Sequence, residues 1–295
     1  VKTRAPALLR AELSSPRWTP QNIAMSGVTD CYQPAERHFR VTRGCLEVCV
    51  EFRQPISIVT KNALVTRDRD LLAELARHQA TAVYVSITTL DTELAGKLEP
   101  RASRPAARLR AIRELTAAGI PTGVMVAPIL PGLTDHEMPA ILAAAAAAGA
   151  TRAGYIVLRL PHAVKDVFLQ WLDDHAPTKK NRIVDRIREL RGGQLNVSEW
   201  GTRLQGEGIF AEQIRALFRA TTRRAGALSL GAGVATIGTG APSCRWVGAA
   251  CALDKPEWFR GGMSIERAER PLARGDGAEG LTSSSQVNIG GFPFG

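Results

Sequence analysis

Five polar residues that could bind a charged ligand follow apolar runs of the chain; they are Thr29, Asp30, Lys61, Ser86 and Arg101. A lysine or an arginine binds a carboxylate or a phosphate, whereas an aspartate binds an ammonium group. This combination predicts a site that grips a zwitterionic amino acid moiety. Each residue taken singly could equally be a helix cap or a surface residue, and Asp68 is interpreted as a helix cap only.

The apolar runs that precede these residues recur about every 30 residues, which is the length of a βαβ unit. The expected strands are Ile23–Gly27, Ile56–Thr60, Ala82–Thr88, Thr122–Ala127 and Gly154–Leu160. Helical patterns separate or follow them at Arg37–Arg53, Asp68–His78, Ala106–Ala118, Glu137–Ala148 and Val164–His175. The alternation predicts an α/β protein with a parallel sheet that is open or curled into a barrel.

The carboxyl ends of parallel strands meet at one edge of the sheet, and ligands bind there in α/β folds. Because the polar candidates follow the strands, we expect Thr29, Asp30, Lys61, Ser86 and Arg101 to surround one mouth.

The composition is that of an ordinary globular protein, with 45% hydrophobic and 22% charged residues in 295. The longest apolar run, 141–150, is mostly alanine and too short to cross a bilayer. No secretory signal pattern opens the chain. Five cysteines are too few for a disulfide framework in so long a chain, so we expect reduced thiols and a cytoplasmic location.

The formal net charge of +10 is typical of a protein that attracts nucleic acid or phosphorylated ligands. A basic run at 179–182, followed by Arg186 and Arg188, could contact a nucleic acid backbone. An arginine-rich, solvated surface explains the same pattern, so nucleic acid stays one of two interpretations.

Two regions differ in character. Residues 1–220 carry the strand and helix patterns, whereas residues 221–295 are rich in Gly, Pro and Ser and are expected to have little order, as an irregular C-terminal tail. A shift of reading frame near residue 225 is one hypothesis for this change. The chain opens on a short helix, Pro6–Leu13, which predicts that a first strand is missing in front of Val1.

Four segments carry a resemblance to a known family; they read TDCYQPAE, IVTKNALVTRDRDLL, VSITTLD…LEPRASRPAARLRAI and VMVAPILPGLTD. In this order, within residues 1–220, they resemble the radical SAM superfamily, in the branch of spore photolyase-like proteins. The resemblance implies a partial (β/α)6 TIM-like barrel that holds a [4Fe–4S] cluster and S-adenosylmethionine. It also implies an electron donor and a 5′-deoxyadenosyl radical that abstracts hydrogen from a substrate, which the sequence does not identify.

The same resemblance implies roles for the candidate residues. Thr29 and Asp30 match the segment that receives the methionyl amino group, and Lys61 matches a lysine that approaches the methionyl carboxylate. Ser86 and Arg101 match further polar contacts to the cofactor. The stretch Val126–Pro131 is similar to the one that passes the adenine.

The cysteines depart from the family pattern, which is C-x3-C-x2-C near the end of the first barrel strand. Cys45 and Cys49 have the first spacing, but residue 52 is Phe and both cysteines lie in an apolar helical pattern, as core residues do. The triplet is therefore expected upstream of Val1, and the chain alone is expected to be inactive. Cys31 has two interpretations, a hydrogen-atom donor to a substrate radical or a small buried filler.

Three functions follow, in order of preference. The first is a radical SAM enzyme, represented by a fragment, with an unknown substrate. The second is a DNA-binding or DNA lesion repair protein that uses the basic surface. The third is a barrel without a cluster that keeps a cofactor pocket and has lost catalysis.

Overall fold

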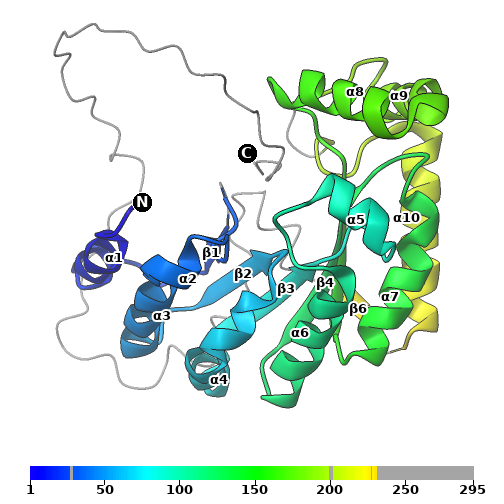
Figure 1. The fold of residues 1–295 in the computed structure, drawn as a ribbon. Coiled ribbons are helices and arrows are strands. Elements are labelled where there is room, and N and C mark those ends of the chain that lie inside the picture. Colours follow the sequence, from blue (N-terminus) through cyan, green and yellow to red (C-terminus); the bar gives the residue numbers. More distant parts are fainter. Residues whose placement is uncertain (27–28, 199–201, 227, 231–295) are drawn as a thin grey trace, which may run out of the picture.

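A computed structural model describes residues 1–26, 29–198, 202–226 and 228–230 and contains one six-stranded parallel sheet (Figure 1). Its strands are β1 (Ile23–Met25), β2 (Ile56–Thr60), β3 (Thr81–Ser86), β4 (Thr122–Ile129), β5 (Arg152–Val157) and β6 (Ser229–Leu230). They pair in sequence order, with β1 and β6 at the two edges. This sequential parallel order confirms the partial (β/α)6 arrangement that the sequence predicts.

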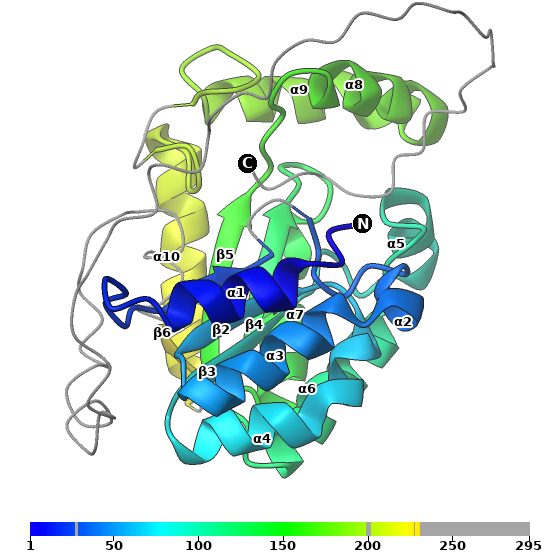
Figure 2. The same cartoon turned by 90° about the vertical axis from the view of Figure 1, so that its left-hand side faces the viewer.

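Helices connect the strands and cover the outer face of the sheet (Figures 1 and 2). They are α1 (Ala5–Leu13), α2 (Glu36–Phe39), α3 (Val41–Phe52), α4 (Arg69–Arg77), α5 (Thr92–Leu98), α6 (Pro105–Ala117), α7 (Met138–Ala147), α8 (Val164–His175), α9 (Lys180–Glu189) and α10 (Gly208–Arg224). Short 3₁₀ turns lie at Ala63–Asp68, Asp135–Glu137 and Pro177–Lys179. No helix of the described residues is long and apolar enough to span a membrane.

Both faces of the central strands are buried, which explains their continuous apolar sequences. Along β3, Val83 and Val85 pack in the main core with the helices, whereas Ala82 and Tyr84 belong to a separate cluster on the opposite, inner face. Gly123 of β4 lies against the Tyr84 ring, because a Cβ at this glycine would approach the ring to 2.7 Å. The tyrosine therefore fills the inner face at this level.

Helices α8 and α9 lie across the carboxyl ends of the strands (Figures 1 and 2). They enclose a second apolar cluster, in which Phe168 and Trp171 of α8 pack with Leu158, the residue that follows β5. The carboxyl edge is thus the side of the sheet where loops and two extra helices gather.

The predicted helix Arg37–Arg53 is wrong in one respect, because it is split into α2 and α3 at Arg40. Arg40 has a φ of 48°, in the left-handed region, so the helix cannot run through it. The break allows the carboxylate of Glu36 to accept hydrogen bonds from the backbone N–H groups of Thr42 (3.0 Å) and Arg43 (3.3 Å). Glu36 therefore caps the first turn of α3.

Helix α10 crosses the predicted boundary at residue 220 and ends at Arg224. It packs through Ala211, Ile214 and Phe218, which recur at helical spacing, and β6 then joins the edge of β5. Residues 231–295 lie outside the described residues, so the frame shift stays a prediction.

Candidate functional site

Lys61 and Ser86 lie side by side at the carboxyl edge of the sheet. In the register of the two strands, Thr60 pairs with Val85, and Lys61 and Ser86 are the next residues. Ser86 shares the inner face with Tyr84, two residues before it, because side chains alternate along a strand. The structure thus brings these two predicted residues together.

Glu99, the residue after α5, is the centre of the polar contacts at this edge. Its carboxylate pairs with Lys61 Nζ at 2.6 Å and with Arg108 Nη2 at 2.5 Å, and it accepts a hydrogen bond of 2.7 Å from the Thr88 hydroxyl. The side chain is 6% exposed. Burial alone would raise the pKa of Glu99, but the charges of Lys61 and Arg108 outweigh it and hold the pKa at about 2.

Arg108 extends this cluster from α6 to the end of β3. Its Nη1 donates to the carbonyl of Ser86 at 2.9 Å, and its Nε donates to the carbonyl of Ser103 at 2.7 Å. The guanidinium is fully buried and links the ends of β3, α5 and α6. Glu99 and Arg108 therefore fix the position of Lys61.

The hydroxyl of Ser86 is buried and has no hydrogen-bond partner within the described residues. A buried hydroxyl without a partner costs free energy unless a ligand or a water supplies the missing bond. It lies beside Lys61, so this edge offers a cation and an unused hydroxyl next to each other. Such a pair fits the carboxylate of an amino acid ligand.

The carboxylate of Asp30 has a structural role in this chain. Its Oδ1 accepts from the Thr60 hydroxyl at 2.7 Å and from the Tyr32 N–H at 2.9 Å, and its Oδ2 accepts from the Lys61 N–H at 2.8 Å. The bonds from Thr60 and Lys61 tie the loop after β1 to the end of β2, and the bond from Tyr32 lies within the loop. Asp30 is close to Lys61, as predicted, but both of its oxygens already hold the backbone.

Thr29 and Arg101, unlike Ser86 and Glu99, are exposed, and Arg101 lies in the turn after α5. The sequence segment that contains Arg101 also contains Glu99, and of these two residues Glu99 is the buried one. The missed signal is an acidic residue at the end of an apolar helix pattern, between Leu98 and Pro100.

Cys31 lies in the loop after β1, where the Ser26 hydroxyl donates to its sulfur at 3.0 Å. Burial raises the pKa of the Cys31 thiol far above its usual range, and the negative charge of Asp30 acts in the same direction. The residue therefore keeps its S–H at neutral pH.

The described residues do not fit a [4Fe–4S] cluster. Cys45 and Cys49 lie on α3, where Cys49 packs in the main core. Burial raises the pKa of Cys45 to about 11 and that of Cys49 to about 12, which is typical of buried structural thiols. No cluster of three or more potential metal ligands occurs among the described residues. Cys244 and Cys251 lie outside them.

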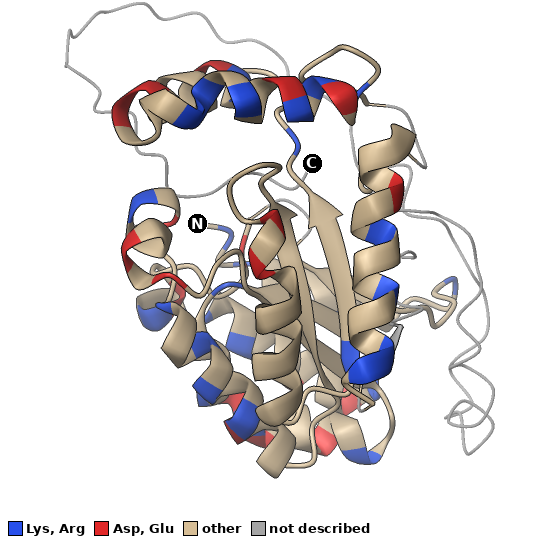
Figure 3. Cartoon of the chain, turned by 90° about the vertical axis from the view of Figure 1, so that its right-hand side faces the viewer, with Lys and Arg blue, Asp and Glu red and all other residues tan. Residues whose placement is uncertain are grey.

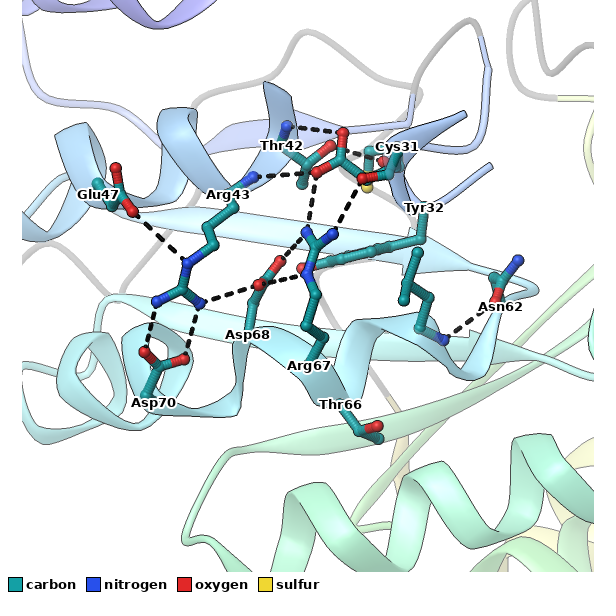
Figure 4. A network of polar contacts seen from close by, with 12 residues as sticks. Cys31, Tyr32, Thr42, Arg43, Glu47, Asn62, Thr66, Arg67, Asp68 and Asp70 are labelled. Atoms are coloured by element: carbon teal, nitrogen blue, oxygen red, sulfur yellow. Dashed lines mark hydrogen bonds and ion pairs between the residues drawn. The ribbon is translucent and has the colours of Figure 1, made fainter. Parts of the chain in front are cut away.

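Asp68 belongs to a second polar network, which joins α2 and α3 to α4 (Figure 4). Asp68 stands at the N-cap position of α4, as expected, but its carboxylate makes no hydrogen bond to a backbone N–H group of that helix. It accepts instead from Arg67 Nε (2.8 Å) and Nη2 (2.7 Å), and from Arg43 Nη1 (3.0 Å). Because Asp68 is 0% exposed, its charge is compensated by these guanidinium groups alone among the described residues.

The lowered pKa of Glu99 predicts a loss of stability in acid. Its pKa is about 2 in the folded chain against an ordinary value of 4.5, so the carboxylate stabilises the fold above pH 4.5, and this contribution is lost as the pH falls toward 2. We expect a loss of about 3 kcal/mol over that window. Urea unfolding at a series of pH values should show a smaller loss of stability in acid for Glu99→Gln than for the wild type. Equal losses in the two proteins would contradict the assignment.

Comparisons with known proteins indicate which family the chain resembles. Residues 10–145 match the model of the radical SAM superfamily. The uncharacterized protein Rv2578c of Mycobacterium tuberculosis is 38% identical over 192 residues, which cover 64% of this chain and 55% of that protein. The uncharacterized protein MJ0683 of Methanocaldococcus jannaschii is 34% identical over 115 residues, which cover 39% of this chain and 43% of that protein. The chain thus spans about half the length of the curated relatives it matches.

Among solved structures, two mutants of spore photoproduct lyase are similar. One has a TM-score of 0.47 and 17% identity, over 74% of this chain and 62% of that one. Another, with bound AdoMet and a dinucleoside spore photoproduct, has a TM-score of 0.40 and 18% identity, over 61% of this chain and 60% of that one. At these scores the likeness carries no functional argument. The family match rests on the sequence, and it places residues 10–145 in similarity to the radical SAM superfamily.

Proposed function

We propose that this chain forms the S-adenosylmethionine-binding part of a radical SAM enzyme. The observation that carries the proposal is the buried, partnerless hydroxyl of Ser86 beside the Lys61 ammonium, at the carboxyl edge of the sheet in the segment that is similar to that superfamily. Lys61 would hold the methionyl carboxylate, and Ser86 would donate a hydrogen bond to the same group. Arg101 and Thr29, which are exposed, would contact the cofactor from the rim of the site.

Asp30 would act on the ligand mainly through the backbone that it holds. Its carboxylate keeps the end of β2 and the following loop in place, and so keeps Lys61 in place. The bound cofactor, together with an iron–sulfur cluster, would supply a 5′-deoxyadenosyl radical. The three thiolates for such a cluster do not come from the described residues. We propose that they lie in a part of the protein upstream of Val1.

Cys31 fits the role of a hydrogen-atom donor. Such a donor must carry its hydrogen on sulfur, and the raised pKa of this thiol keeps it protonated. The Ser26 hydroxyl fixes the position of the sulfur, close to the loop that Asp30 anchors. A buried filler needs no such fixed orientation.

A nucleic acid substrate is the second candidate, and the charge of the protein favours it. Helix α9 and the turn before it carry exposed basic residues at Lys179, Arg182 and Arg188 (Figure 3). This helix lies across the carboxyl edge, on the side where the cofactor would bind. A polyanion such as DNA would be attracted there, with an affinity that falls steeply as the salt concentration rises.

The substitution Lys61→Ala tests the cofactor site. We expect the affinity for S-adenosylmethionine, measured by isothermal calorimetry, to fall about tenfold or more, because one charge-assisted hydrogen bond to the carboxylate is lost. Arg108 still compensates Glu99 in this variant, so the chain should stay folded by circular dichroism.

The matched control is Lys97→Ala, which removes an exposed lysine of α5 that pairs with Glu93 at the surface. Its affinity should equal that of the wild type. An unchanged affinity in Lys61→Ala, or no binding by the wild-type chain, would contradict the proposed site.

A further inference from the structure

Thr88, two residues after β3, places a single hydroxyl between two acceptors. The residue is 2% exposed. Its Oγ1 lies 2.7 Å from Oε1 of Glu99 and 3.0 Å from the carbonyl oxygen of Ala127 on β4. A threonine hydroxyl carries one hydrogen, and neither a carboxylate nor a carbonyl supplies another. The hydroxyl can therefore donate fully to only one of these two groups at a time.

The Glu99 oxygen that Thr88 reaches is the same one that pairs with Lys61. Lys61 Nζ lies 2.6 Å from Oε1, whereas Arg108 pairs with Oε2. A ligand carboxylate that binds the Lys61 ammonium must share it with Oε1, and the two negative charges repel each other. A hydrogen bond from Thr88 to Oε1 stabilises the charge of Glu99 at that oxygen. This bond therefore lowers the cost of sharing Lys61 with a ligand.

The Ala127 carbonyl gives the same hydrogen a second place. The register of β3 and β4 ends at the pair Ser86 and Met125, so this carbonyl lies beyond the last paired residues of the two strands. While Lys61 serves Oε1 alone, the hydrogen of Thr88 is available to the carbonyl. When a ligand draws on Lys61, the hydrogen is worth more at Oε1. Rotation about the Cβ–Oγ1 bond makes this change without moving the backbone.

We propose that Thr88 is a positioning residue for Lys61, and that its hydroxyl turns from the Ala127 carbonyl to Glu99 when a ligand carboxylate binds. The proposal rests on the proposed function, because it concerns the same lysine. Thr88 acts through Glu99 and favours ligands that carry a carboxylate next to Lys61. A ligand without that group gains nothing from the hydroxyl.

The substitution Thr88→Val tests this role, because it removes the hydroxyl and keeps the shape of the side chain. Two ligands are titrated by isothermal calorimetry: S-adenosylmethionine, and decarboxylated S-adenosylmethionine, which differs only in lacking the carboxylate. We expect the affinity for S-adenosylmethionine to fall about fivefold or more and the affinity for the decarboxylated ligand to stay unchanged. Thr88→Ser keeps a hydroxyl and should restore most of the affinity. An equal loss for both ligands would show a merely structural role and overturn the proposal.

The matched control is Thr89→Val. Thr89 is 1% exposed, and its hydroxyl donates to a different carboxylate, that of Glu137, at 2.6 Å. The control thus removes a buried bond of the same kind, and its affinity for S-adenosylmethionine should equal that of the wild type. A loss as large as that of Thr88→Val would contradict the role of Thr88.

The variant Lys61→Ala separates this proposal from the proposed function. In that background Thr88→Val should change the affinity for S-adenosylmethionine no further, because Thr88 acts through Lys61. Additive losses would overturn the role of Thr88. If Lys61→Ala weakens binding and Thr88→Val does not, the role of Thr88 is wrong and the cofactor site stands. If neither substitution weakens binding, or the wild-type chain binds neither ligand, both proposals are wrong.

Discussion

Glu99→Ala is expected to lower the free energy of unfolding by about 3–5 kcal/mol, because it leaves two buried cations without their carboxylate. Lys61 and Arg108 both pair with Glu99, and the Arg108 side chain is only 2% exposed. Water cannot reach that guanidinium to replace the lost partner. Urea unfolding followed by circular dichroism measures the change.

The control for this prediction lies on the neighbouring helix. Glu93 pairs with Lys97 at the surface of α5 and is 78% exposed, so Glu93→Ala should change the stability by less than about 1 kcal/mol. Equal effects of the two substitutions would show that burial does not govern the Glu99 cluster. The interpretation of Glu99 as the residue that fixes Lys61 would then fail.

Asp68→Ala is the second substitution with a large expected effect, about 3–5 kcal/mol of destabilisation. The carboxylate is 0% exposed and pairs with both Arg43 and Arg67, and Arg67 also pairs with the buried Glu36. Its loss removes the ion pairs that Arg43 and Arg67 make with it, whereas those of Arg43 with Asp70 and of Arg67 with Glu36 remain (Figure 4). Thermal and urea unfolding should both report the change, with an unaltered cofactor affinity wherever the variant is folded.

Asp70 provides the comparison within the same network. It pairs with Arg43 through two hydrogen bonds, of 2.7 and 3.1 Å, but its side chain is 56% exposed. Asp70→Ala should therefore cost less than about 1 kcal/mol, although it breaks two hydrogen bonds to Arg43 and Asp68→Ala breaks only one. A cost as large as that of Asp68→Ala would contradict the role assigned to burial.

The repeating strands could be predicted from the sequence because they are buried on both faces. The predicted strands Ala82–Thr88 and Thr122–Ala127 correspond to β3 and β4, which differ from them by only one or two residues at an end. Strand β6 has only two residues and carries no such signal. It joins the sheet by pairing with β5, which is a tertiary effect that no local pattern reports.

The candidate site was harder to predict, because side chains choose partners that are distant in sequence. Asp30 and Lys61 follow their strands as predicted, yet the carboxylate of Asp30 binds backbone groups and the ammonium of Lys61 pairs with Glu99, 38 positions further along the chain. Arg108 looked like one more polar position of a helix. Its burial depends on how α6 packs against the end of β3, and the pattern of polar and apolar residues along the sequence does not reveal that packing.

The bonds of Asp30 have a consequence for how the site moves. β1 has only three residues and lies at the edge of the sheet, so it is held by few bonds of its own. Asp30 grips the backbone of Lys61, and Cys31 is its neighbour in the chain. Through Asp30, the backbone of Cys31 is therefore held to the end of β2, so Cys31 and Lys61 are expected to keep their relative positions even when the edge of the sheet shifts.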